Sequence, residues 1–466
     1  MDLAYLTPPI VMALVFLRFV PVTSAMDLDS TLDSMETGLV RVPLTLLQLR
    51  NETAPLLQRR RWVVGGTASC GVAASLTNFD DFEIPMTSAP RHFGYTARFS
   101  VGTHAALPST SPSSAVPSSP MNLLVDTGSD LIVVTSASCE ADDCLLVPHK
   151  FDCLKSPTCS PQDMLDPTRR YRQVYGDGTV AAGTILRDSI SFQAADGRKI
   201  CVPEQSLLVV DQAGLNLTRS YGPGVDGIVG LNLGSPAIKA TLLQNLQRIQ
   251  ETIAERDRQS RKPWFNDVSP SAPLGYMSLW LGKSLEPGQG GELMFGGVDW
   301  TKMAGSLLWS QRKPTAHDWS LVLDRGILVN GTHPLSHTPG NLAVIDSGSD
   351  GIYLQRSDYD ELFQQIPGAI QLSTGYWRVP CRGSTFLSVS IEGREYGFPY
   401  HDWVEHEHPL QSTSGSEYPE GYCKSRVFGS SPGPTLLGAL FLRAVYTVFD
   451  FRQRGLERVG FAPIRH

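Results

Sequence analysis

Short apolar runs separated by glycine and proline dominate the hydrophobic pattern of this chain. Because β-strands of about four to eight residues are bounded by such turn residues, the pattern predicts a strand-rich fold. One stretch, residues 239–260, is different and predicts an amphipathic helix with a charged outer face. Its apolar positions follow helical spacing, at Leu242, Leu243, Leu246, Ile249 and Ile253.

The apolar pattern also repeats at long range. Residues 123–134 read LLVDTGSDLIVV, and residues 343–354 read AVIDSGSDGIYL. Each Asp-Thr/Ser-Gly-Ser-Asp turn is followed later by an apolar-apolar-glycine strand, at Ile228-Val229-Gly230 and at Leu436-Leu437-Gly438. This period is too long for a solenoid, so the repeat predicts a duplicated architecture of two lobes.

Two segments without this periodicity suggest how the lobes are divided. Residues 104–120 are rich in serine and proline, and we expect a surface loop between two strands there. A proline-containing stretch that ends at Leu274 is expected to connect the lobes. We therefore expect the N-terminal lobe to cover residues 76–274 and the C-terminal lobe to cover residues 275–466.

The first 75 residues carry signs of export and processing. An apolar stretch precedes the small residues Thr23–Ala25, which predicts a signal peptide over residues 1–25. A buried helix is the alternative, because Arg18 interrupts the stretch and no basic residue precedes it. The cluster Arg59–Arg61 predicts a processing site, although a solvated charge run has the same pattern. We accordingly expect residues 26–75 to be a propeptide.

Composition narrows the class of protein further. The 466 residues carry a net charge of −7, which argues against nucleic acid as the main partner. No run of 18 apolar residues follows the N-terminus, so we expect a soluble form without a stable membrane anchor. Eight cysteines and sequons at Asn51, Asn216 and Asn330 favour the secretory pathway, ending outside the cell or in an acidic endolysosomal or vacuolar lumen. A monomer is expected.

Two aspartates in matching turns point to one kind of chemistry. The repeat should bring Asp126 and Asp346 face to face, where two carboxyl groups share one proton. The ionised group can take a proton from a water while the protonated group polarises a carbonyl, which hydrolyses a peptide bond without a covalent intermediate. Supporting hydroxyl groups are expected from Thr127, Ser129 and Ser347. Substrate contacts are expected from Gly128, Gly348 and Ser349.

A further turn motif, Tyr175-Gly176-Asp177-Gly178-Thr179, lies between the two aspartates. Asp-Gly is typical of a two-residue hairpin turn, which would place Tyr175 near a mobile tip. Such a hairpin can close over an extended peptide and contact it through Tyr175, Gly176 and Asp177. An ordinary exposed hairpin is the alternative.

Together these motifs resemble the pepsin family of aspartic proteases over nearly all of residues 93–464. The matching segments are FGYTARFSVGT, LLVDTGSD, YGDGT, VDGIVGLN, YMSLWLG, ELMFGGVDW, AVIDSGSD and the stretch from LLGALFLRAVYTVFD to VGFAPI. The resemblance implies an all-β, bilobal, pepsin-like double-barrel fold with pseudo-two-fold symmetry and a central cleft. It also implies an aspartic endopeptidase made as a zymogen, whose propeptide covers the cleft and whose flap tyrosine is Tyr175.

Two positions depart from the family pattern. Val133 stands seven residues after Asp126, where the family usually has a tryptophan that bonds the flap tyrosine, so the positioning of the flap is open. Ala439 stands where many acid-active members have an aspartate, as in the renin-like branch. One fewer acidic neighbour predicts a pH optimum milder than strongly acidic, although Asp130 and Asp350 could offset this effect.

The resemblance also implies disulfide bonds, while the sequence alone leaves their connectivity open. Two expected pairs, Cys139–Cys144 and Cys381–Cys423, match disulfides of the family. Cys153–Cys159 matches the cysteine-rich insertion of nepenthesin-like members, and Cys70 would then pair with Cys201. Zinc is not expected, because paired C-x-x-C ligands are missing.

Some motifs in the sequence match other kinds of site or function. The segment 222–227 matches G-x-G-x-x-G without a βαβ frame, and His401, His406 and His408 lack an H-E-x-x-H helix, so neither a cofactor nor a metal is expected. A catalytically inactive pepsin-like binding or inhibitor protein is the main alternative function, supported by Val133. A two-carboxylate glycosidase would use related hydrolytic chemistry, but no cluster of aromatic residues for stacking sugars supports it.

Overall fold

The structure of the chain, a computed structural model, divides it into two units, Met1–Gln58 and Arg59–His466. Only the second unit contains residues whose placement is described. The described ranges are 82–88, 94–104, 116–117, 120–176, 178–193, 199–213, 224–234, 241–260, 275–282, 290–314, 316–335, 342–405, 421–430 and 433–465. Several predicted features lie outside these ranges: the signal peptide, the propeptide, Arg59–Arg61, Asn51, Asn216, Cys70, Asp177, His406 and His408.

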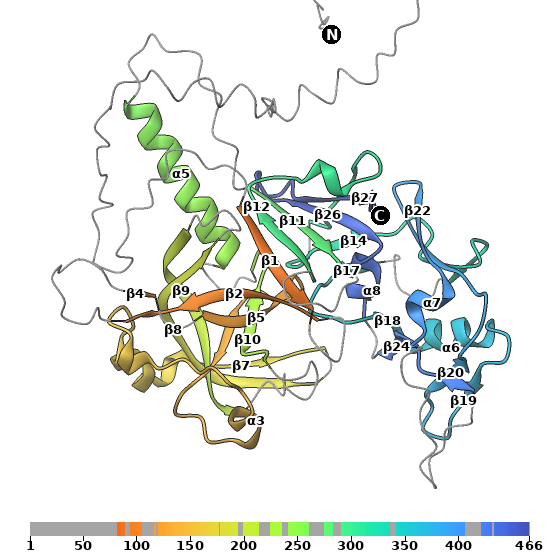
Figure 1. Ribbon diagram of the computed structural model, residues 1–466, viewed down its shortest axis with the longest axis horizontal. Helices are drawn as coiled ribbons and strands as arrows, with labels where there is room; N and C mark the ends of the chain where they lie inside the picture. Colours follow the sequence, from red (N-terminus) through yellow and green to blue (C-terminus); the bar gives the residue numbers. More distant parts are fainter. Residues whose placement is uncertain are drawn as a thin grey trace, which may run out of the picture. The chain divides into compact units, whose positions relative to one another are not determined.

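A 13-stranded sheet is the largest sheet of the described structure (Figure 1). Its order is β13-β27-β26-β11-β12-β1-β2-β5-β10-β6-β9-β8-β7. These strands are β1 (Phe82–Ser88), β2 (Tyr95–Val101), β5 (Pro120–Asp126), β6 (Ile132–Thr135), β7 (Arg170–Val174), β8 (Val180–Gln193), β9 (Lys199–Ala213), β10 (Gly227–Gly230), β11 (Tyr276–Leu281), β12 (Gly291–Phe295), β13 (Leu308–Gln311), β26 (Val445–Asp450) and β27 (Arg458–Pro463). Because β1 pairs with both β2 and β12, both halves of the sequence contribute to one sheet.

Four smaller sheets occur among the described residues. The five-stranded sheet contains β14 (Ser320–Val322), β17 (Leu342–Ile345), β25 (Thr435–Leu437), β18 (Ile352–Gln355) and β24 (Val427–Ser430). The four-stranded sheet contains β16 (His333–Leu335), β15 (Ile327–Val329), β21 (Leu387–Ile391) and β22 (Arg394–Phe398). The three-stranded sheet contains β19 (Ile370–Gln371), β20 (Trp377–Pro380) and β23 (Tyr422–Cys423). The two-stranded sheet pairs β3 (Thr103–His104) with β4 (Val116–Pro117). The predicted all-β architecture is confirmed.

The two halves of the sequence repeat one arrangement of strands. The segment β2-β5-β10-β6-β9 of the large sheet corresponds to β14-β17-β25-β18-β24 of the five-stranded sheet. In both, the successive pairings are antiparallel, parallel, antiparallel and parallel. This shared pattern is the structural form of the sequence repeat, and it confirms the bilobal, duplicated fold.

Helices are few, and one of them is the predicted amphipathic helix. The α-helices described are α3 (Asp142–Leu145), α5 (Leu242–Ser260), α6 (Arg356–Gln364), α7 (Tyr400–Trp403) and α8 (Ala439–Leu442). Before α5, Thr241 Oγ1 accepts from Gln244 N at 3.3 Å while Gln244 Oε1 accepts from Thr241 N, which is a capping box. Leu242, Leu243 and Leu246 are buried, as predicted, while the side chain of Ile253 lies outside the described residues. In the described part of the chain, no helix is long and apolar enough to cross a membrane.

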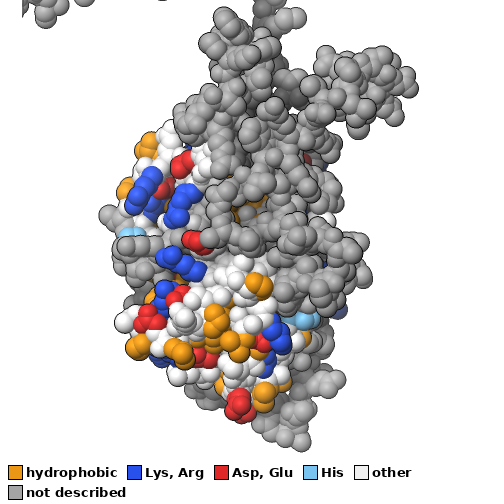
Figure 2. Space-filling view, turned by 90° about the vertical axis from the view of Figure 1, so that its left-hand side faces the viewer, with side chains coloured by type: hydrophobic (Ala, Val, Ile, Leu, Met, Phe, Trp, Pro, Cys, Tyr) orange, Lys and Arg blue, Asp and Glu red, His pale blue; other side chains and the backbone are white. Residues whose placement is uncertain are grey.

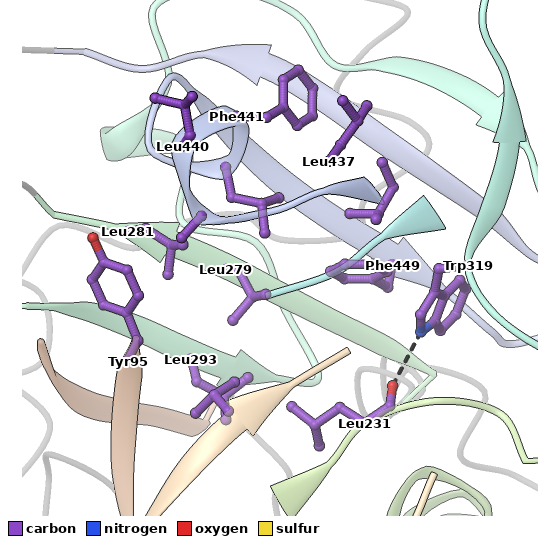
Figure 3. Packing of buried hydrophobic residues seen from close by; sticks show 14 of the residues in the cluster. Tyr95, Leu231, Leu279, Leu281, Leu293, Trp319, Leu437, Leu440, Phe441 and Phe449 are labelled. Atoms are coloured by element: carbon purple, nitrogen blue, oxygen red, sulfur yellow. Dashed lines mark hydrogen bonds between the residues drawn. The ribbon is translucent and has the colours of Figure 1, made fainter. Parts of the chain in front are cut away.

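One hydrophobic core connects the elements of both halves. In Figure 3, Tyr95 from β2, Leu279 and Leu281 from β11, and Phe449 from β26 lie within one cluster of buried side chains. Each fully buried leucine or phenylalanine stabilises the fold by roughly 1.5–3 kcal/mol relative to exposure. The strands that carry the two aspartates are therefore held by a continuous core.

The face shown in Figure 2 carries Lys and Arg side chains next to Asp and Glu side chains, among hydrophobic and uncharged ones. Neither sign of charge forms a continuous stripe on the described residues of this face. A nucleic-acid-binding surface would need clustered positive charge. The mixed charges of this face agree with the mild net charge of −7.

The expected loop and disulfides can be located in part. Residues 104–120 do connect two paired strands, β2 and β5, and the ends of the segment pair with each other as β3 and β4. Cys201 is disulfide-bonded as well, but Cys70 lies outside the described residues. Three predicted disulfides are present, namely Cys139–Cys144, Cys153–Cys159 and Cys381–Cys423.

Candidate active site

The N-terminal aspartate turn begins where β5 ends. Asp126 is the last residue of β5, and its carboxyl group accepts two hydrogen bonds from its own turn. Gly128 N donates to Asp126 Oδ1 at 2.8 Å, and Ser129 Oγ donates to Asp126 Oδ2 at 2.5 Å. These short local bonds fix the orientation of the carboxyl group, because both of its oxygens are engaged.

The C-terminal aspartate turn has the same bonds. Asp346 directly follows β17, Gly348 N donates to Asp346 Oδ1 at 2.9 Å, and Ser349 Oγ donates to Asp346 Oδ2 at 2.6 Å. Ser129 and Ser349 thus have equivalent roles, although the sequence analysis placed Ser349 among substrate contacts. Both serines orient a carboxyl group.

Four hydrogen bonds connect the two turns to each other. Thr127 N donates to Ser347 Oγ at 3.0 Å, and Ser347 N donates to Thr127 Oγ1 at 2.9 Å. The same hydroxyls donate onward, from Thr127 to Ile345 O at 2.8 Å and from Ser347 to Val125 O at 2.7 Å. Both side chains are fully buried. This reciprocal network brings Asp126 and Asp346 together, as the sequence repeat predicts.

Glycine is required at the third position of each turn. A Cβ atom on Gly128 would lie 2.5 Å from Asp346 Oδ1, closer than real Cβ contacts allow. A Cβ atom on Gly348 would collide with Asp126 Oδ1 in the same way. The sequence analysis assigned these glycines to the approach of substrate; in the structure each one makes room for the opposite carboxyl group.

The environment of the pair favours one shared proton. Asp126 is only 5% exposed, and the pKa of its carboxyl group is raised from 3.8 to about 8, chiefly because burial disfavours the charged form. The charge of Asp346 and a side-chain hydrogen bond with it contribute to this rise, while the bonds from Ser129 and Gly128 oppose it. Asp126 therefore keeps a proton at a pH at which an ordinary aspartate is ionised.

Trp319 supports both turns, and the sequence analysis missed it. Its indole Nε1 donates to Leu231 O at 3.0 Å, as the dashed line in Figure 3 marks, and Leu231 N donates to Asp126 O at 2.7 Å. Its backbone oxygen accepts from Ile345 N at 3.2 Å, next to Asp346. No motif marks this tryptophan in the sequence, since its role depends on contacts between distant segments.

The predicted hairpin is formed by β7 and β8. Val174 pairs with Val180, Tyr175 N donates to Thr179 O at 2.9 Å, and Gly178 N donates to Tyr175 O at 3.0 Å. The loop therefore contains the three residues 176–178, and the expected two-residue turn is wrong by one residue. Gly178 has a φ of +85°, which is typical of the last position of a three-residue hairpin loop.

Packing relates Tyr175 to the unusual valine. Val133 lies in β6, is fully buried and pairs with Ile228 of β10. Tyr175 packs against the cluster of apolar residues that includes Val133, and this cluster is separate from the large core. The cluster consists of Leu124, Leu131, Val133, Ala181, Leu208, Val210, Val225 and Ile228. Apolar contacts thus position the hairpin tyrosine in a chain that lacks the family's tryptophan.

The remaining candidates lie outside the pair. Ala439 begins α8, is buried and donates its backbone N–H to Ser349 O at 2.7 Å, while Asp350 accepts from Tyr353. His401 is exposed on α7 and lies 3.6 Å from Asp402 Oδ1. The described residues contain no cluster of three His, Cys, Asp or Glu side chains that could hold a metal ion.

Several known proteins have sequences similar to this chain. Gastricsin of Mus musculus is 25% identical over 453 residues, which cover 92% of this chain and 96% of gastricsin. Rhizopuspepsin of Rhizopus chinensis is 23% identical over 383 residues, which cover 82% of this chain and 81% of that protein. A probable aspartic-type endopeptidase, CTSD, of Arthroderma benhamiae is 26% identical over 349 residues, and the matched part covers 74% of this chain but only 58% of the relative.

The family assignment rests on a match to a family model. A model of the family described as eukaryotic aspartyl protease matches residues 115–464, which is more than half of the chain. The matched region includes Asp126, Asp346 and the hairpin with Tyr175. The chain belongs to the eukaryotic aspartyl protease family.

Proposed function

We propose that the protein is an aspartic endopeptidase, which hydrolyses peptide bonds of protein substrates with a water molecule held between Asp126 and Asp346. The observation that carries this proposal is the hydrogen-bonded pair of carboxyl groups in two equivalent turns, of which Asp126 is buried and Asp346 is half-buried. Such a pair holds one proton and so provides an acid and a base at once.

The roles of the two carboxyl groups follow from where the proton resides. Asp126, with its raised pKa, holds the proton and donates it to the carbonyl oxygen of the scissile peptide bond. Asp346 takes a proton from the water, whose oxygen forms a bond to the carbonyl carbon. In the resulting tetrahedral diol, Asp346 gives its proton to the amide nitrogen, one diol hydroxyl returns a proton to Asp126, and the C–N bond breaks. One water is consumed, and a carboxylic acid and an amine are released.

Substrates would bind in an extended conformation under the β7–β8 hairpin. We assign contacts with substrate to Tyr175, Gly176 and Asp177, whose hairpin can exclude water when it closes. The backbone of Gly128 and Gly348 lies beside the carboxyl groups, where a peptide must approach. No cofactor takes part in this mechanism.

The biosynthesis of the enzyme is part of the proposal. Residues 1–25 would direct the chain into the secretory pathway, residues 26–75 would keep it latent as a zymogen, and the two lobes would span residues 76–274 and 275–466. Arg41 and Arg50 of the propeptide could pair with the aspartates and release them at low pH. The disulfides support an oxidising compartment, because such bonds are rare in cytosolic proteins.

Cleavage of a mixed peptide library between about pH 3 and pH 7 tests the function, with and without residues 1–75. Asp126→Asn and Asp346→Asn should each lower kcat/KM by about 10³-fold or more, because each removes the acid or the base. Asp142→Asn, in the exposed first turn of α3, is the matched control and should leave activity unchanged.

Cleavage that persists in both aspartate variants would refute the proposed mechanism. Failure of the unaltered chain to cleave any peptide, even after trimming to residue 76, would instead favour the inactive binding or inhibitor protein. Thermal unfolding of each variant separates a loss of chemistry from a loss of fold, because asparagine matches aspartate in size.

A further inference from the structure

The turn between β15 and β16 presents one sequon at the surface. Val329 pairs with His333, and Asn330, Gly331 and Thr332 form the turn between them. Asn330 and Gly331 have φ values of 52° and 71°, in the left-handed region that asparagine and glycine tolerate best. Asn330 and Thr332 are both exposed. The Asn-Gly-Thr acceptor sequence is therefore displayed on a rigid hairpin.

Asn330 is held directly against Phe386. Beyond the last ladder pair, Val329 with Leu387, Asn330 N donates to Phe386 O at 2.7 Å. In return, Phe386 N donates to the side-chain oxygen Asn330 Oδ1 at 2.9 Å. The side-chain oxygen of the asparagine thus has a fixed partner, and the nitrogen of the same amide group is the atom that a sugar would modify.

Phe386 itself is unusually exposed. It is 39% exposed, and it is the one phenylalanine among the exposed large hydrophobic residues of the described ranges. Its ring lies over Gly397 of β22, where an added Cβ atom would collide with Phe386 Cζ. The ring therefore rests on β22 while part of it faces solvent, and the backbone of the same residue is hydrogen-bonded to Asn330.

We infer that Asn330 carries an N-linked glycan whose first N-acetylglucosamine packs against the ring of Phe386. The sugar would come from a lipid-linked oligosaccharide pyrophosphate. A bond forms between Asn330 Nδ2 and C1 of the sugar, the bond from C1 to the pyrophosphate oxygen breaks, and the amide nitrogen gives up one proton. The apolar C–H face of the sugar then covers aromatic surface that is otherwise in contact with water.

The surroundings leave room for this sugar. A Cβ atom on Gly331 would have Glu395 Oε2 at 3.9 Å as its nearest neighbour, so the outer side of the turn is open. The Asn330 Oδ1 bond to Phe386 N stays intact after modification, because the sugar is attached to the nitrogen. This inference does not depend on the proposed peptidase activity.

A double-mutant cycle tests both the glycan and its contact. The full chain is secreted from a eukaryotic host, and glycopeptide mass spectrometry locates the modified asparagines. Thr332→Ala removes the acceptor sequence but keeps the bond from Phe386 N to Asn330. We expect a glycan on Asn330 in the unaltered chain and none in Thr332→Ala, with Tm lowered by about 2 °C or more.

The same substitution is then made in a Phe386→Ala background, where loss of the glycan should leave Tm nearly unchanged. Unglycosylated protein from a bacterial host is the matched control, in which Thr332→Ala should have no effect with Phe386 present. A peptide map without sugar on Asn330 would overturn the inference. An equal loss of Tm in both Phe386 backgrounds would overturn the contact with Phe386.

Discussion

The two aspartate turns have nearly identical hydrogen bonds, but the elements that surround them differ. Within each turn, a glycine N–H and a serine hydroxyl bind the carboxyl group, and a threonine or serine hydroxyl reaches across to the other turn. Outside, the turn at Asp126 lies in a 13-stranded sheet that ends in the β7–β8 hairpin. The turn at Asp346 lies in a five-stranded sheet, and α6 follows β18 directly.

The seventh residue after each aspartate illustrates this difference. Val133 is buried in the apolar cluster against which Tyr175 packs. Tyr353, at the equivalent place, donates from its hydroxyl to Asp350 Oδ1 at 2.8 Å, and its ring lies 4.9 Å from that of Phe428. The bonds that hold the carboxyl groups are thus shared, while the residues that follow serve the hairpin in one half and a local polar contact in the other.

In their side chains, the two halves of the molecule therefore match only where residues lie at hydrogen-bond distance from Asp126 or Asp346. Close contacts at hydrogen-bond distance permit few side chains, so both turns kept the same pattern. Packing a few residues away tolerates different side chains of suitable volume. Substitutions within the turns should therefore have equal effects in the two halves, and larger effects than substitutions outside them.

The largest effect is expected at the turn glycines. Gly128→Ala and Gly348→Ala place a methyl group against the opposite carboxyl group, so each should lower kcat/KM by about 10²-fold or more, since misplacement of about 1 Å has this cost. Gly305→Ala is the matched control outside the site, because a Cβ atom there would meet only Pro463 Cδ, at an ordinary contact distance of 3.8 Å. Peptide hydrolysis at one pH measures all three variants.

A large loss in only one of the two turn variants would break the proposed equivalence of the turns. A comparable loss in Gly305→Ala would show that the assay responds to glycine replacement in general rather than to crowding of the carboxyl pair.

A smaller effect, on stability, is expected from the hydroxyls that connect the turns. Thr127→Val and Ser347→Ala each leave a buried N–H without its acceptor, which should lower the free energy of unfolding by about 1–3 kcal/mol. The double variant should lose less than the sum, because each residue takes part in both of the reciprocal bonds. Chemical denaturation of the four proteins gives the coupling directly.

Ser138→Ala is a useful comparison and should lower the free energy of unfolding far less, because Ser138 is exposed although its hydroxyl bonds the buried Ser136. Additive losses at Thr127 and Ser347 would mean that the two bonds act independently, and the turns would then not form one cooperative unit.

The last effect is a change in the slope of Tm against pH, which comes from the proton that Asp126 holds. Because the pKa of Asp126 rises from 3.8 in the unfolded chain to about 8 in the folded chain, the folded state binds more protons at this site between those values. The contribution of Asp126 to stability should therefore fall as pH rises through this window. Asp126→Asn should make the decrease of Tm with pH shallower, and thermal unfolding between about pH 4 and pH 8 measures it.

An identical slope in Asp126→Asn would assign the pH dependence to other groups. The raised pKa also bears on activity, since Asp126 keeps its proton above the usual range of an aspartate. We therefore expect a pH optimum that is milder than strongly acidic, as Ala439 suggests, and a rate maximum below about pH 3 would contradict it.

Several features could be predicted from the sequence because they are local or repeated. The two aspartate turns and the helix that contains Leu246 have patterns of residue type and spacing that few structures satisfy, whereas the three disulfides were implied by the resemblance to the pepsin family. The hairpin was also predicted correctly, but the predicted loop was one residue shorter than the loop in the structure. Turn length depends on the positive φ that Gly178 adopts, and Asp-Gly is compatible with more than one loop.

Other features depend on contacts between distant segments. Trp319 links Leu231 to Ile345, and Tyr175 packs against a cluster that includes Val133, yet no spacing in the sequence relates these residues. The shared sheet of β1 and β12 likewise crosses the sequence boundary expected at residue 274.

The sequence by itself determined the repeated turns, the chemistry of paired carboxyl groups and the all-β class, because these follow from short motifs and alternation of apolar residues. The tertiary structure decided which groups crowd each carboxyl group, and hence the raised pKa of Asp126 and the need for Gly128 and Gly348. It also decided that Asn330 lies beside Phe386. Such effects depend on distances of a few ångströms between residues far apart in the chain, and residue order alone does not specify those distances.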